Sequence, residues 1–356
     1  MVRAVFWLSL GWAAYVYFGY PLLLMIWSRV AMRRVRKAPL EPRVDLVIAM
    51  HNERENVAPK MKNCFELDYP AEKLNLIVSL DAPTDQTDAV VAGYAGPRVK
   101  ILSSSVRRGK AAALNNALTV ATSEIVVFTD ARQRFDPSAI RELVANFSDP
   151  TVGAVSGQLI LLDAEGRESG DAVGLYWRYE KKLRAMESEI HSVPGSTGAI
   201  YAIRRELFEP LPPKTVLDDV LVPMRIVLRG KRAIFEPAAL AYDRVSVAPE
   251  IEYEKKCRTL MGNYELIARL PELLVPWKNP IFLQVVSHKV GRLLVPYCLV
   301  TLLISNLFLR HGYYRYFLVC QMAWYLLAIG GWLASKVRDA HPAGPVNTLE
   351  QVNRNV

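Results

Sequence analysis

Acidic residues follow three apolar runs of the chain in a fixed order. Asp81 ends the run in LIVSLDAPTDQT, Asp130 ends the run in IVVFTDARQ, and the pair Asp218 and Asp219 lies in TVLDDVLVPMR. Carboxylates can take a proton from a nucleophile, ligate a divalent cation or accept hydrogen bonds from a ligand. Because a parallel α/β sheet gathers the carboxyl ends of its strands at one edge, we expect these side chains to share a crevice.

Two more features of the expected crevice have alternative explanations. In VDLVIAMHNERENV, Asn52 and Glu53 follow a strand and precede a helix, where helix N-terminal amides favour a base, a ribose or a phosphate. Ordinary helix capping explains these two residues equally well. Asp81 could contact a nucleobase or support a turn, whereas Asp85 and Thr87 in the same loop are expected to shape the turn and cap the next helix.

A basic loop, VRRGKAAALNNAL, precedes another expected helix. It is not a P-loop, because no glycine lies five positions before Gly109, and Ala111 follows Lys110 where Ser or Thr would be needed. Lys110, with Arg107 and Arg108, still places positive charge beside a helix N-terminus, where a diphosphate would be stabilised. A solvated basic turn is the alternative.

Strand and helix patterns alternate between residues 40 and 270. Short runs rich in Val and Ile predict strands buried on both faces: VDLVIAM, LNLIVSL, VKILSS, EIVVFTD and VGAVSG. The segments between them predict crossover helices over Asn56–Leu67, Gln86–Tyr94, Lys110–Ala121 and Pro137–Phe147, the last with Asp136 as N-cap. The alternation predicts an α/β domain with a mostly parallel sheet.

The composition indicates that part of the chain lies in a membrane. Hydrophobic residues make up 51% of the 356 residues. The uncharged run Ala4–Trp27 is long enough to cross a hydrocarbon core of about 30 Å. A secretory signal peptide would have a shorter apolar region with basic residues before it, whereas here they follow it. We expect a transmembrane helix over residues 1–28, with its N-terminus outside and its basic flank in the cytoplasm.

Two apolar stretches near the end of the chain, Leu293–Leu309 and Tyr316–Ala334, predict a transmembrane hairpin over residues 293–335. Basic residues flank both ends, so both ends should face the cytoplasm, including a tail over 336–356. Residues 271–292 mix Trp, Pro and basic residues with apolar ones, which predicts an interfacial helix.

The net charge is +9, which raises the question of nucleic-acid binding. Much of the excess positive charge lies beside the apolar spans, where anionic lipid headgroups explain it. We therefore expect membrane lipids as partners and no nucleic acid. The four cysteines, Cys64, Cys257, Cys298 and Cys320, contain no closely spaced pair and predict neither a zinc site nor a disulfide framework.

Six motifs in order resemble the membrane-bound family 2 glycosyltransferases, the group that includes hyaluronan, chitin and cellulose synthases. The motifs are HNERE, SLDAPTDQT, RRGKAAALNNAL, FTDARQ, GSTGAIYAIRREL and VLDDVLVPMRI. The resemblance covers residues 44 to 265 and extends to the flanking spans. It implies a GT-A fold, in which a Rossmann-like half binds a nucleotide-sugar, usually UDP-linked, and the other half presents an acceptor.

The resemblance also implies roles for individual residues. Asn52 and Glu53 would approach the uridine and ribose, Asp81 the uracil, and Lys110 the nucleotide. Asp219, in the place of the invariant Asp of the family's Glu-Asp pair, would be the general base. An inverting transfer needs a carboxylate to take the proton of the acceptor hydroxyl and a positive environment for the departing diphosphate. Helix capping by Asp218 or Asp219 is compatible with that role, since one can cap while the other is free.

The chain departs from the family at its metal motif. The Asp-x-Asp motif reads Asp130-Ala131-Arg132. Asp130 would therefore still contact the sugar donor and its metal ion, whereas Arg132 replaces the second carboxylate. A divalent ion, Mg²⁺ or Mn²⁺, would then depend on Asp130, diphosphate oxygens and water. We expect Arg132 to supply part of the charge neutralisation, so that activity survives chelation better than in an enzyme with both carboxylates.

A second departure concerns the acceptor side. Processive members carry Gln-x-x-Arg-Trp, whereas here Arg258 keeps the arginine without the Gln and the Trp. Tyr264 or Trp177 could offer a stacking face instead, although Trp177 is explained as well by a helix on the membrane. The residues expected at the acceptor are Asp218, Arg258 and three members of a glycine-rich loop, Gly195, Ser196 and Gly198; a plain tight turn explains that loop nearly as well.

We therefore expect a multi-pass inner-membrane glycosyltransferase with a cytoplasmic catalytic domain, acting on a polysaccharide or lipid-linked acceptor in cell-surface polysaccharide synthesis. Three spans are few for a polysaccharide tunnel, so secretion would need a homo-oligomer or an export partner. One alternative is a transferase that adds a single sugar to a polyprenyl-phosphate or glycolipid. The non-enzyme alternative is a membrane-anchored nucleotide-sugar sensor or scaffold.

Overall fold

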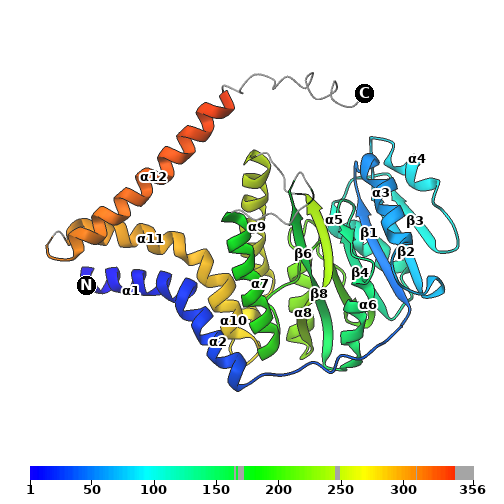
Figure 1. Ribbon diagram of the computed structural model, residues 1–356, viewed down its shortest axis with the longest axis horizontal. Coiled ribbons are helices and arrows are strands. Elements are labelled where there is room, and N and C mark those ends of the chain that lie inside the picture. The colour runs from blue at the N-terminus through cyan, green and yellow to red at the C-terminus, as the bar shows by residue number, and fades with distance from the viewer. Residues whose placement is uncertain (164–165, 167–171, 245–248, 310, 341–356) are drawn as a thin grey trace, which may run out of the picture. The chain divides into compact units, whose positions relative to one another are not determined.

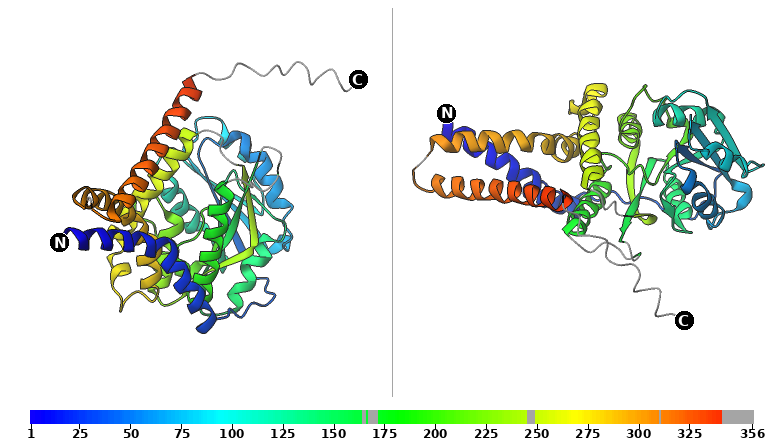
Figure 2. Two further views of the ribbon diagram at one scale, coloured as in Figure 1. Left: turned by 60° about the vertical axis from the view of Figure 1, so that its left-hand side comes forward. Right: turned by 90° about the horizontal axis from the view of Figure 1, so that it is seen from above.

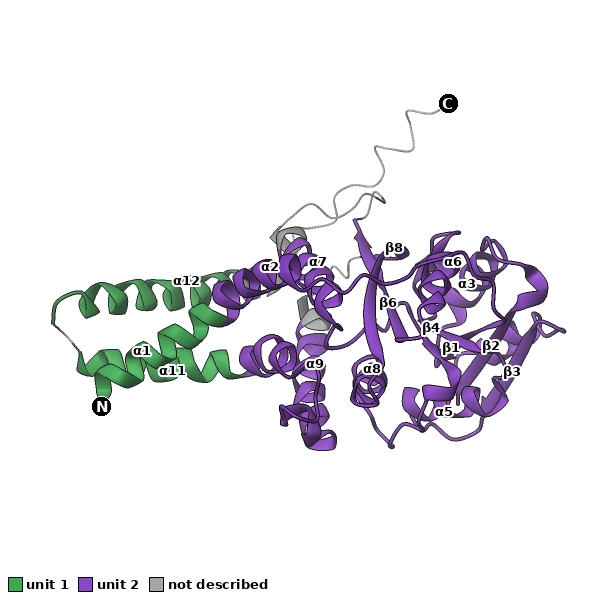
Figure 3. Cartoon of the chain, turned by 90° about the horizontal axis from the view of Figure 1, so that it is seen from below, with its two compact units in different colours: residues 1–15, 294–356 green, residues 16–293 purple. Residues whose placement is uncertain are grey.

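A computed structural model describes residues 1–163, 166, 172–244, 249–309 and 311–340 of the chain. The chain forms two compact units, shown in different colours in Figure 3. Residues 1–15 and 294–356 make up the first unit, and residues 16–293 make up the second. The second unit contains the sheet and every expected site residue, and each unit is described by itself.

An eight-stranded sheet in the order β3-β2-β1-β4-β7-β6-β8-β5 forms the centre of the second unit (Figure 1). Strands β1, β2, β3 and β4 are mutually parallel, and β6 is parallel to β8. Strand β7 joins these two groups by antiparallel pairing with both β4 and β6, and β5 pairs antiparallel with β8. The strands are β1 (Val44–Met50), β2 (Leu74–Asp81), β3 (Val99–Ser104), β4 (Ile125–Asp130), β5 (Arg134–Phe135), β6 (Val152–Leu162), β7 (Tyr201–Arg204) and β8 (Arg232–Arg244).

Helices cover both faces of the sheet, as the two views in Figure 2 also show. On one face α3 (Arg54–Phe65), α4 (Thr87–Ala92) and α6 (Ala139–Val144) bury their apolar side chains against the strands. On the other face α5 (Lys110–Val120) and α8 (Asp218–Leu228) do the same. Burial on both faces explains why the parallel strands are almost continuously apolar.

The predicted fold class, a mostly parallel α/β domain, is confirmed, and all four crossover helices are present. The helix expected over Pro137–Phe147 begins two residues later, at Ala139, and continues as a 3-10 turn over Ala145–Ser148. Asp136 does not cap it directly: its carboxylate accepts hydrogen bonds from the backbone and hydroxyl of Ser138. Strands β5, β7 and β8 have no counterpart among the predicted strands.

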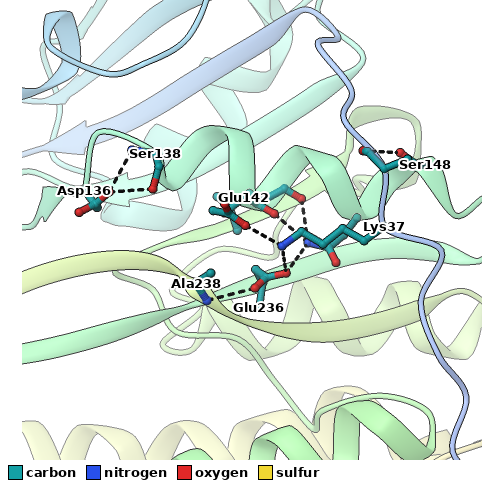
Figure 4. Close-up of polar contacts among 10 residues, drawn as sticks. Lys37, Asp136, Ser138, Glu142, Ser148, Glu236 and Ala238 are labelled. Atoms are coloured by element: carbon teal, nitrogen blue, oxygen red, sulfur yellow. Dashed lines mark hydrogen bonds and ion pairs between the residues drawn. The ribbon is translucent and has the colours of Figure 1, made fainter.

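The segment between the first membrane helix and β1 lies along the sheet domain. Lys37 bridges Glu142 and the buried Glu236, with N···O distances of 2.6 and 2.8 Å (Figure 4). The carbonyl of Ala38 accepts a hydrogen bond from Ser148, and the backbone amide of Arg36 donates to Asp149. Because these bonds recur along the segment, residues 33–43 form a strap that is fixed to the domain.

Three helices are long and apolar enough to cross a membrane: Val2–Val30, Phe282–Phe308 and Tyr314–Ala334. The first consists of α1 (Val2–Ala14), a π-helical turn (Tyr15–Gly19) and α2 (Tyr20–Val30). The second consists of α10 (Phe282–Gln284), a π-helical turn (Val285–Val290) and α11 (Gly291–Phe308), and the third belongs to α12 (Tyr314–Ala340). The predicted arrangement of one N-terminal and two C-terminal spans is confirmed.

The interfacial helix expected over 271–292 needs correction. Pro271–Leu274 is a single 3-10 turn, and from Phe282 onward the chain belongs to the second long helix, which therefore begins well before the expected Leu293. The sequence pattern was misleading because Ser287, His288 and Lys289 interrupt the apolar run, although His288 lies between the carboxylates of Glu180 and Glu187. Of the expected tail over 336–356, residues 336–340 continue α12, and residues 341–356 lie outside the described residues.

Two helices remain in the second unit. Helix α7 (Ala172–Ile190) packs against α2 and β8, and α9 (Pro249–Arg269) follows β8. In the first unit Phe6 packs edge-on against Tyr314 and Phe317, and the hydroxyls of Ser9 and Thr301 are 2.8 Å apart. Aromatic packing and polar contacts thus join the helices of that unit.

Candidate active site

A polar cleft of about 660 Å³ opens at the carboxyl ends of the parallel strands. It contains both acidic and basic side chains, from the ends of β1, β2 and β4 and from the helices that follow. Its charged lining residues are Glu53, Asp81, Arg107, Lys110, Asp130, Arg132 and Arg258. The arrangement has the size of a small-molecule site and an excess of cations, which suits an anionic ligand.

Lys110 connects Asp130, which lines the cleft, to the acidic pair Asp218 and Asp219, which is not among the described residues that line it. It is the first residue of α5, and its Nζ lies 2.7 Å from Oδ1 of Asp130 and 3.5 Å from Oδ2 of Asp218. Burial disfavours the charged amine, but Asp218 and Asp130 outweigh burial and raise the pKa of Lys110 above its ordinary value. The cation therefore holds the end of β4 and the start of α8 together.

Asp219 lies in the first turn of α8 beside the glycine-rich loop. The backbone N–H of Gly198 donates to its Oδ2 at 2.8 Å, and the N–H of Ser196 donates to its backbone carbonyl at 2.9 Å. A Cβ on residue 198 would lie 3.3 Å from that carboxylate oxygen and 3.6 Å from Nζ of Lys110, so only glycine leaves this space open. Burial and the charge of Asp218 raise the pKa of Asp219 to about 6, although Lys110 acts in the opposite direction.

Asp81 has a structural role that the sequence had left open. Its two carboxylate oxygens accept hydrogen bonds from the backbone amides of Arg108 and Gly109, both at 2.7 Å. These bonds hold the basic loop at the start of α5 and so position Lys110. Asp81 still lines the cleft, with the ring of His51 bonded to its backbone carbonyl at 2.7 Å.

Asn52 and Glu53 both line a hollow of about 390 Å³ beside the cleft, and Glu53 lines the cleft as well. The side-chain amide of Asn52 exchanges hydrogen bonds with Thr84. Asp85 and Thr87 shape the turn as expected, because the carboxylate of Asp85 accepts hydrogen bonds from both the backbone and the hydroxyl of Thr87, but α4 begins at Thr87 without a side-chain cap.

Helix α9 brings Arg258 to the lining of the cleft. One turn further along α9, a Cβ on Gly262 would lie 2.4 Å from Cγ of Leu217, the residue just before Asp218. Close packing of α9 on the start of α8 is thus possible only with glycine at this position. Neither Tyr264 nor Trp177 is among the described residues that line the cleft.

The donor set does not form a resident metal centre. Among the described residues no group of three or more His, Cys, Asp and Glu side chains could hold an ion. Asp130 already pairs with Lys110. Arg132 offers no carboxylate for an ion, and its Nη2 lies 4.0 Å from Asp243. The residues fit only an ion that arrives with a diphosphate and takes most of its ligands from it.

Sequence analysis missed the buried residue Tyr201. The tyrosine is fully buried, and burial together with the charges of Asp218 and Asp219 raises the pKa of its hydroxyl. Tyr201 follows the glycine-rich loop in GAIY. The apolar pattern of this segment could not predict that the tyrosine would lie close to Asp218 and Asp219.

Comparison with known proteins shows which family and which solved structure the chain resembles. Residues 45–211 match the family described as Glycosyl transferase family 2. The mannosyltransferase PcManGT from Pyrobaculum calidifontis, solved in complex with GDP-Man and Mn²⁺, is 26% identical, with a TM-score of 0.68 over 92% of this chain and 98% of that one. The fold is thus GT-A-like.

The curated relatives agree. The probable glycosyltransferase YdaM of Bacillus subtilis is 23% identical over 242 residues, and the poly-beta-1,6-N-acetyl-D-glucosamine synthase of Staphylococcus epidermidis is 22% identical over 238 residues. Each match covers 64% of this chain and slightly more than half of the relative, 57% and 56%. Residues 45–211 thus carry the match to glycosyl transferase family 2, and the comparisons together support a glycosyltransferase enzyme.

Proposed function

We propose that the chain transfers a sugar with inversion from a nucleoside diphosphate sugar to a polysaccharide or lipid-linked acceptor at the cytoplasmic face of the membrane. The observation that carries the proposal is the position of Lys110, which joins Asp130 in the cleft to the acidic pair at the start of α8. Donor and acceptor groups would therefore meet within the reach of one lysine side chain.

Asp219 is the proposed general base. Its carboxylate would take the proton of the acceptor hydroxyl while that oxygen attacks the anomeric carbon, and a base with a pKa near the working pH is best suited to this. The amide of Gly198 orients the carboxylate. Gly195, Ser196, Asp218 and Arg258 are proposed to surround the acceptor.

The departing nucleoside diphosphate would be stabilised by the cations of the cleft. Lys110, Arg132, Arg107 and Arg258 line it together with the start of α5. Glu53 and Asp81 are proposed to lie on the nucleotide side, with Asn52 acting from the neighbouring hollow.

A divalent ion is proposed as a weakly held partner of the donor, with Asp130 as its protein ligand. When bound, it would neutralise charge on the diphosphate. We expect chelation to reduce activity only in part, because Arg132 remains. Arg132→Asp should make activity strongly dependent on Mg²⁺ or Mn²⁺; complete loss in the unaltered enzyme with EDTA and full rescue by Mn²⁺ would contradict the proposal.

The donor can be identified by nucleotide release from a panel of UDP- and GDP-sugars. The sequence resemblance favours a UDP-sugar, whereas the structural relative binds GDP-Man. Purified enzyme should release one nucleoside diphosphate in the presence of membranes, and no release with any donor would refute a transferase. Product length then separates a polymer from a single addition, because a ladder indicates processive synthesis and one adduct indicates single transfer.

The sensor alternative is less well supported. It rests on the altered metal motif alone, whereas Asp219 and Lys110 keep an arrangement that suits turnover. Location in the inner membrane, with the domain in the cytoplasm, remains part of the proposal, as does assembly with copies of itself or an export partner.

A further inference from the structure

Helix α3 carries a lysine side chain into the interior of the domain. Lys60 is 1% exposed, although lysine side chains almost always reach water. Its Nζ donates hydrogen bonds to Oγ1 of Thr129 at 2.9 Å and to the backbone carbonyl of Gln133 at 2.7 Å. It also lies 4.7 Å from the centre of the Phe135 ring, which is a cation–π distance. The ammonium group, which has three donors, thus contacts two oxygens and one aromatic ring.

The charge of Lys60 is costly at this position. Among the described residues Lys60 forms no ion pair with a carboxylate, and burial lowers the pKa of its amine to about 8. A buried cation that has lost its hydration is unfavourable unless its contacts compensate for the loss. A neutral side chain of similar length would fill the same space at a lower cost. The positive charge therefore calls for an explanation other than packing.

The two oxygens that Lys60 binds lie on either side of the Asp130-Ala131-Arg132 motif. Thr129 precedes the motif, near the end of β4, and Gln133 follows it, just before β5. One ammonium group therefore holds both ends of a three-residue segment. The backbone of the motif cannot shift relative to α3 without lengthening at least one of these hydrogen bonds.

Asn63, about one turn further along α3, holds the next part of the same segment. Its side-chain nitrogen donates to the carbonyl of Phe135 at 2.9 Å, and its side-chain oxygen accepts from the N–H of Phe135 at 2.7 Å. Asn63 is buried as well, so water competes little for these bonds. The chain from Thr129 to Phe135 is therefore attached to α3 at three places.

Gln133 links Lys60 to the side chain of Arg132. Its Nε2 donates to Oδ2 of Asp243 on β8 at 2.7 Å, and Nη2 of Arg132 lies 4.0 Å from the same oxygen. Asp130 and Arg132 both line the cleft. The two charged side chains of the motif therefore extend into the cleft from a segment that Lys60 anchors from behind.

We propose that Lys60 is a positioning residue for the donor, because it holds Asp130 and Arg132 where they face the diphosphate. The inference rests on the proposed function and adds a residue that touches neither the donor nor an ion. Charged groups that are fixed before the donor binds need no rearrangement at the moment of reaction. Glu53, at the start of the same helix, also lines the cleft, so α3 connects the nucleotide side of the site to the motif.

A selective loss of diphosphate binding tests the proposal. UDP and GDP are each titrated into the full chain with Mg²⁺, and uridine and guanosine serve as probes without the diphosphate. Lys60→Met removes the donors and keeps a long, unbranched side chain. It should weaken binding of the preferred nucleoside diphosphate about tenfold and leave binding of the matching nucleoside unchanged. Unchanged diphosphate binding in Lys60→Met would overturn the proposal.

Thr129→Val provides a milder version of the same test. It removes one acceptor of Lys60 and preserves the shape of the side chain, so we expect a loss of about threefold that is again confined to the diphosphate. This variant keeps the proposal testable if Lys60→Met does not fold. Equal losses for the nucleoside and the nucleoside diphosphate in either variant would indicate general damage to the site and contradict the proposal.

Ser123→Ala is the matched control for stability. Ser123 is buried just before the opposite end of β4, where its hydroxyl donates to Asp45 at 2.7 Å, so its loss also removes a buried hydrogen bond from the domain. Its affinity for the nucleoside diphosphate should equal that of the unaltered chain, even where its thermal midpoint falls as far as that of Lys60→Met. A matching loss of affinity would reduce the effect of Lys60 to destabilisation and overturn the proposal.

A variant without the two charged side chains of the motif tests the route of the effect. In the background of Asp130→Asn with Arg132→Met, Lys60→Met should weaken nucleoside diphosphate binding no further, because the groups that it positions are gone. A further loss of about tenfold would show that Lys60 acts by another route. The proposed function is tested separately, because it requires the unaltered chain to bind UDP or GDP more tightly than the nucleoside, whatever the variants do.

Discussion

At the scale of single residues, Lys110 links the proposed donor and acceptor sides of the site. Its position follows from the carboxylate of Asp81, which fixes the loop before α5 through two backbone amides. The cation then lies between Asp130 and Asp218 and moderates the repulsion of three neighbouring carboxylates. One lysine thus shapes both the geometry and the electrostatics of the cleft.

Replacement of Lys110 tests this view. In Lys110→Met, Asp130 and Asp218 lose their shared partner, and the donor diphosphate loses a cation, so we expect kcat/KM for the donor to fall about a hundredfold. Steady-state kinetics of nucleotide release measures the effect. Lys62→Met, which removes an exposed lysine from a surface pair, is the matched control and should leave the rate unchanged. If Lys110→Met released nucleotide at the same rate as Lys62→Met, Lys110 would not have this role in the site.

The raised pKa of Asp219 predicts a pH dependence. The acid form cannot accept a proton, so the acceptor-dependent rate should rise with pH through about 6 and level off above it. In the folded protein the pKa of Asp219 lies above its ordinary value of 3.8, so the protonated carboxyl contributes to the stability of the fold. This contribution is complete below pH 3.8 and is lost as the pH rises through about 6. Asp219→Asn should therefore raise the thermal midpoint at pH 7 more than at pH 4. A rate that is flat from pH 5 to 8 would contradict the assignment.

At the scale of elements, the packing of α9 on the start of α8 determines where Arg258 and Asp219 lie. Gly262 permits that packing, since a Cβ there would overlap Leu217. The strap over residues 33–43 also connects separate elements of the domain: its Lys37 joins the helix of Glu142 to the strand of Glu236 (Figure 4).

Substitution of Gly262 should therefore affect catalysis from a distance. Gly262→Ala forces α9 away from Leu217, which displaces Arg258 and the first turn of α8, and we expect kcat to fall about tenfold or more. Gly96→Ala is the control, because nothing lies within 4 Å of its added Cβ. Kinetics and thermal unfolding of both variants separate misplacement from loss of fold. Equal kcat in the two would show that the close packing is unimportant.

The sequence predicted some elements better than others for physical reasons. Strands buried on both faces and the helices between them have strong patterns, and their polar ends identified Asp81, Asp130 and Lys110. The pattern could not show that Asp81 binds two backbone amides, because those partners carry no side-chain signal. Strands β5 and β7 were missed because they are short, and β8 was missed because Glu236 and Pro237 interrupt its apolar run. The helix starting at Phe282 was obscured by His288 and Lys289.

At the scale of the whole molecule, the three spans and the basic residues beside them define an expected topology. Arg29 lies in the last turn of the first span, Arg33 and Arg34 follow it, and the strap continues into the catalytic domain. Positive flanks are retained in the cytoplasm. The domain and the C-terminal end of the third span should therefore lie on the same side of the membrane.

A labelling experiment tests this topology. A single cysteine placed at the N-terminus, or in the link near His311 between the last two spans, should react with a membrane-impermeant maleimide in intact cells, after the four native cysteines are replaced by serine. A cysteine at Lys62, on the surface of the domain, should react only after the cells are opened. The reverse pattern would place the domain outside and rule out a cytoplasmic nucleotide-sugar as its donor.

The central claim is that Asp219 removes a proton from an acceptor held beside a nucleotide-sugar. It is tested most directly by measuring nucleotide release and donor affinity together in Asp219→Asn. We predict that release falls by a factor on the order of a hundred to ten thousand, while the Kd of the donor changes little. Release at the unaltered rate, or loss of donor binding in parallel with activity, would contradict the claim.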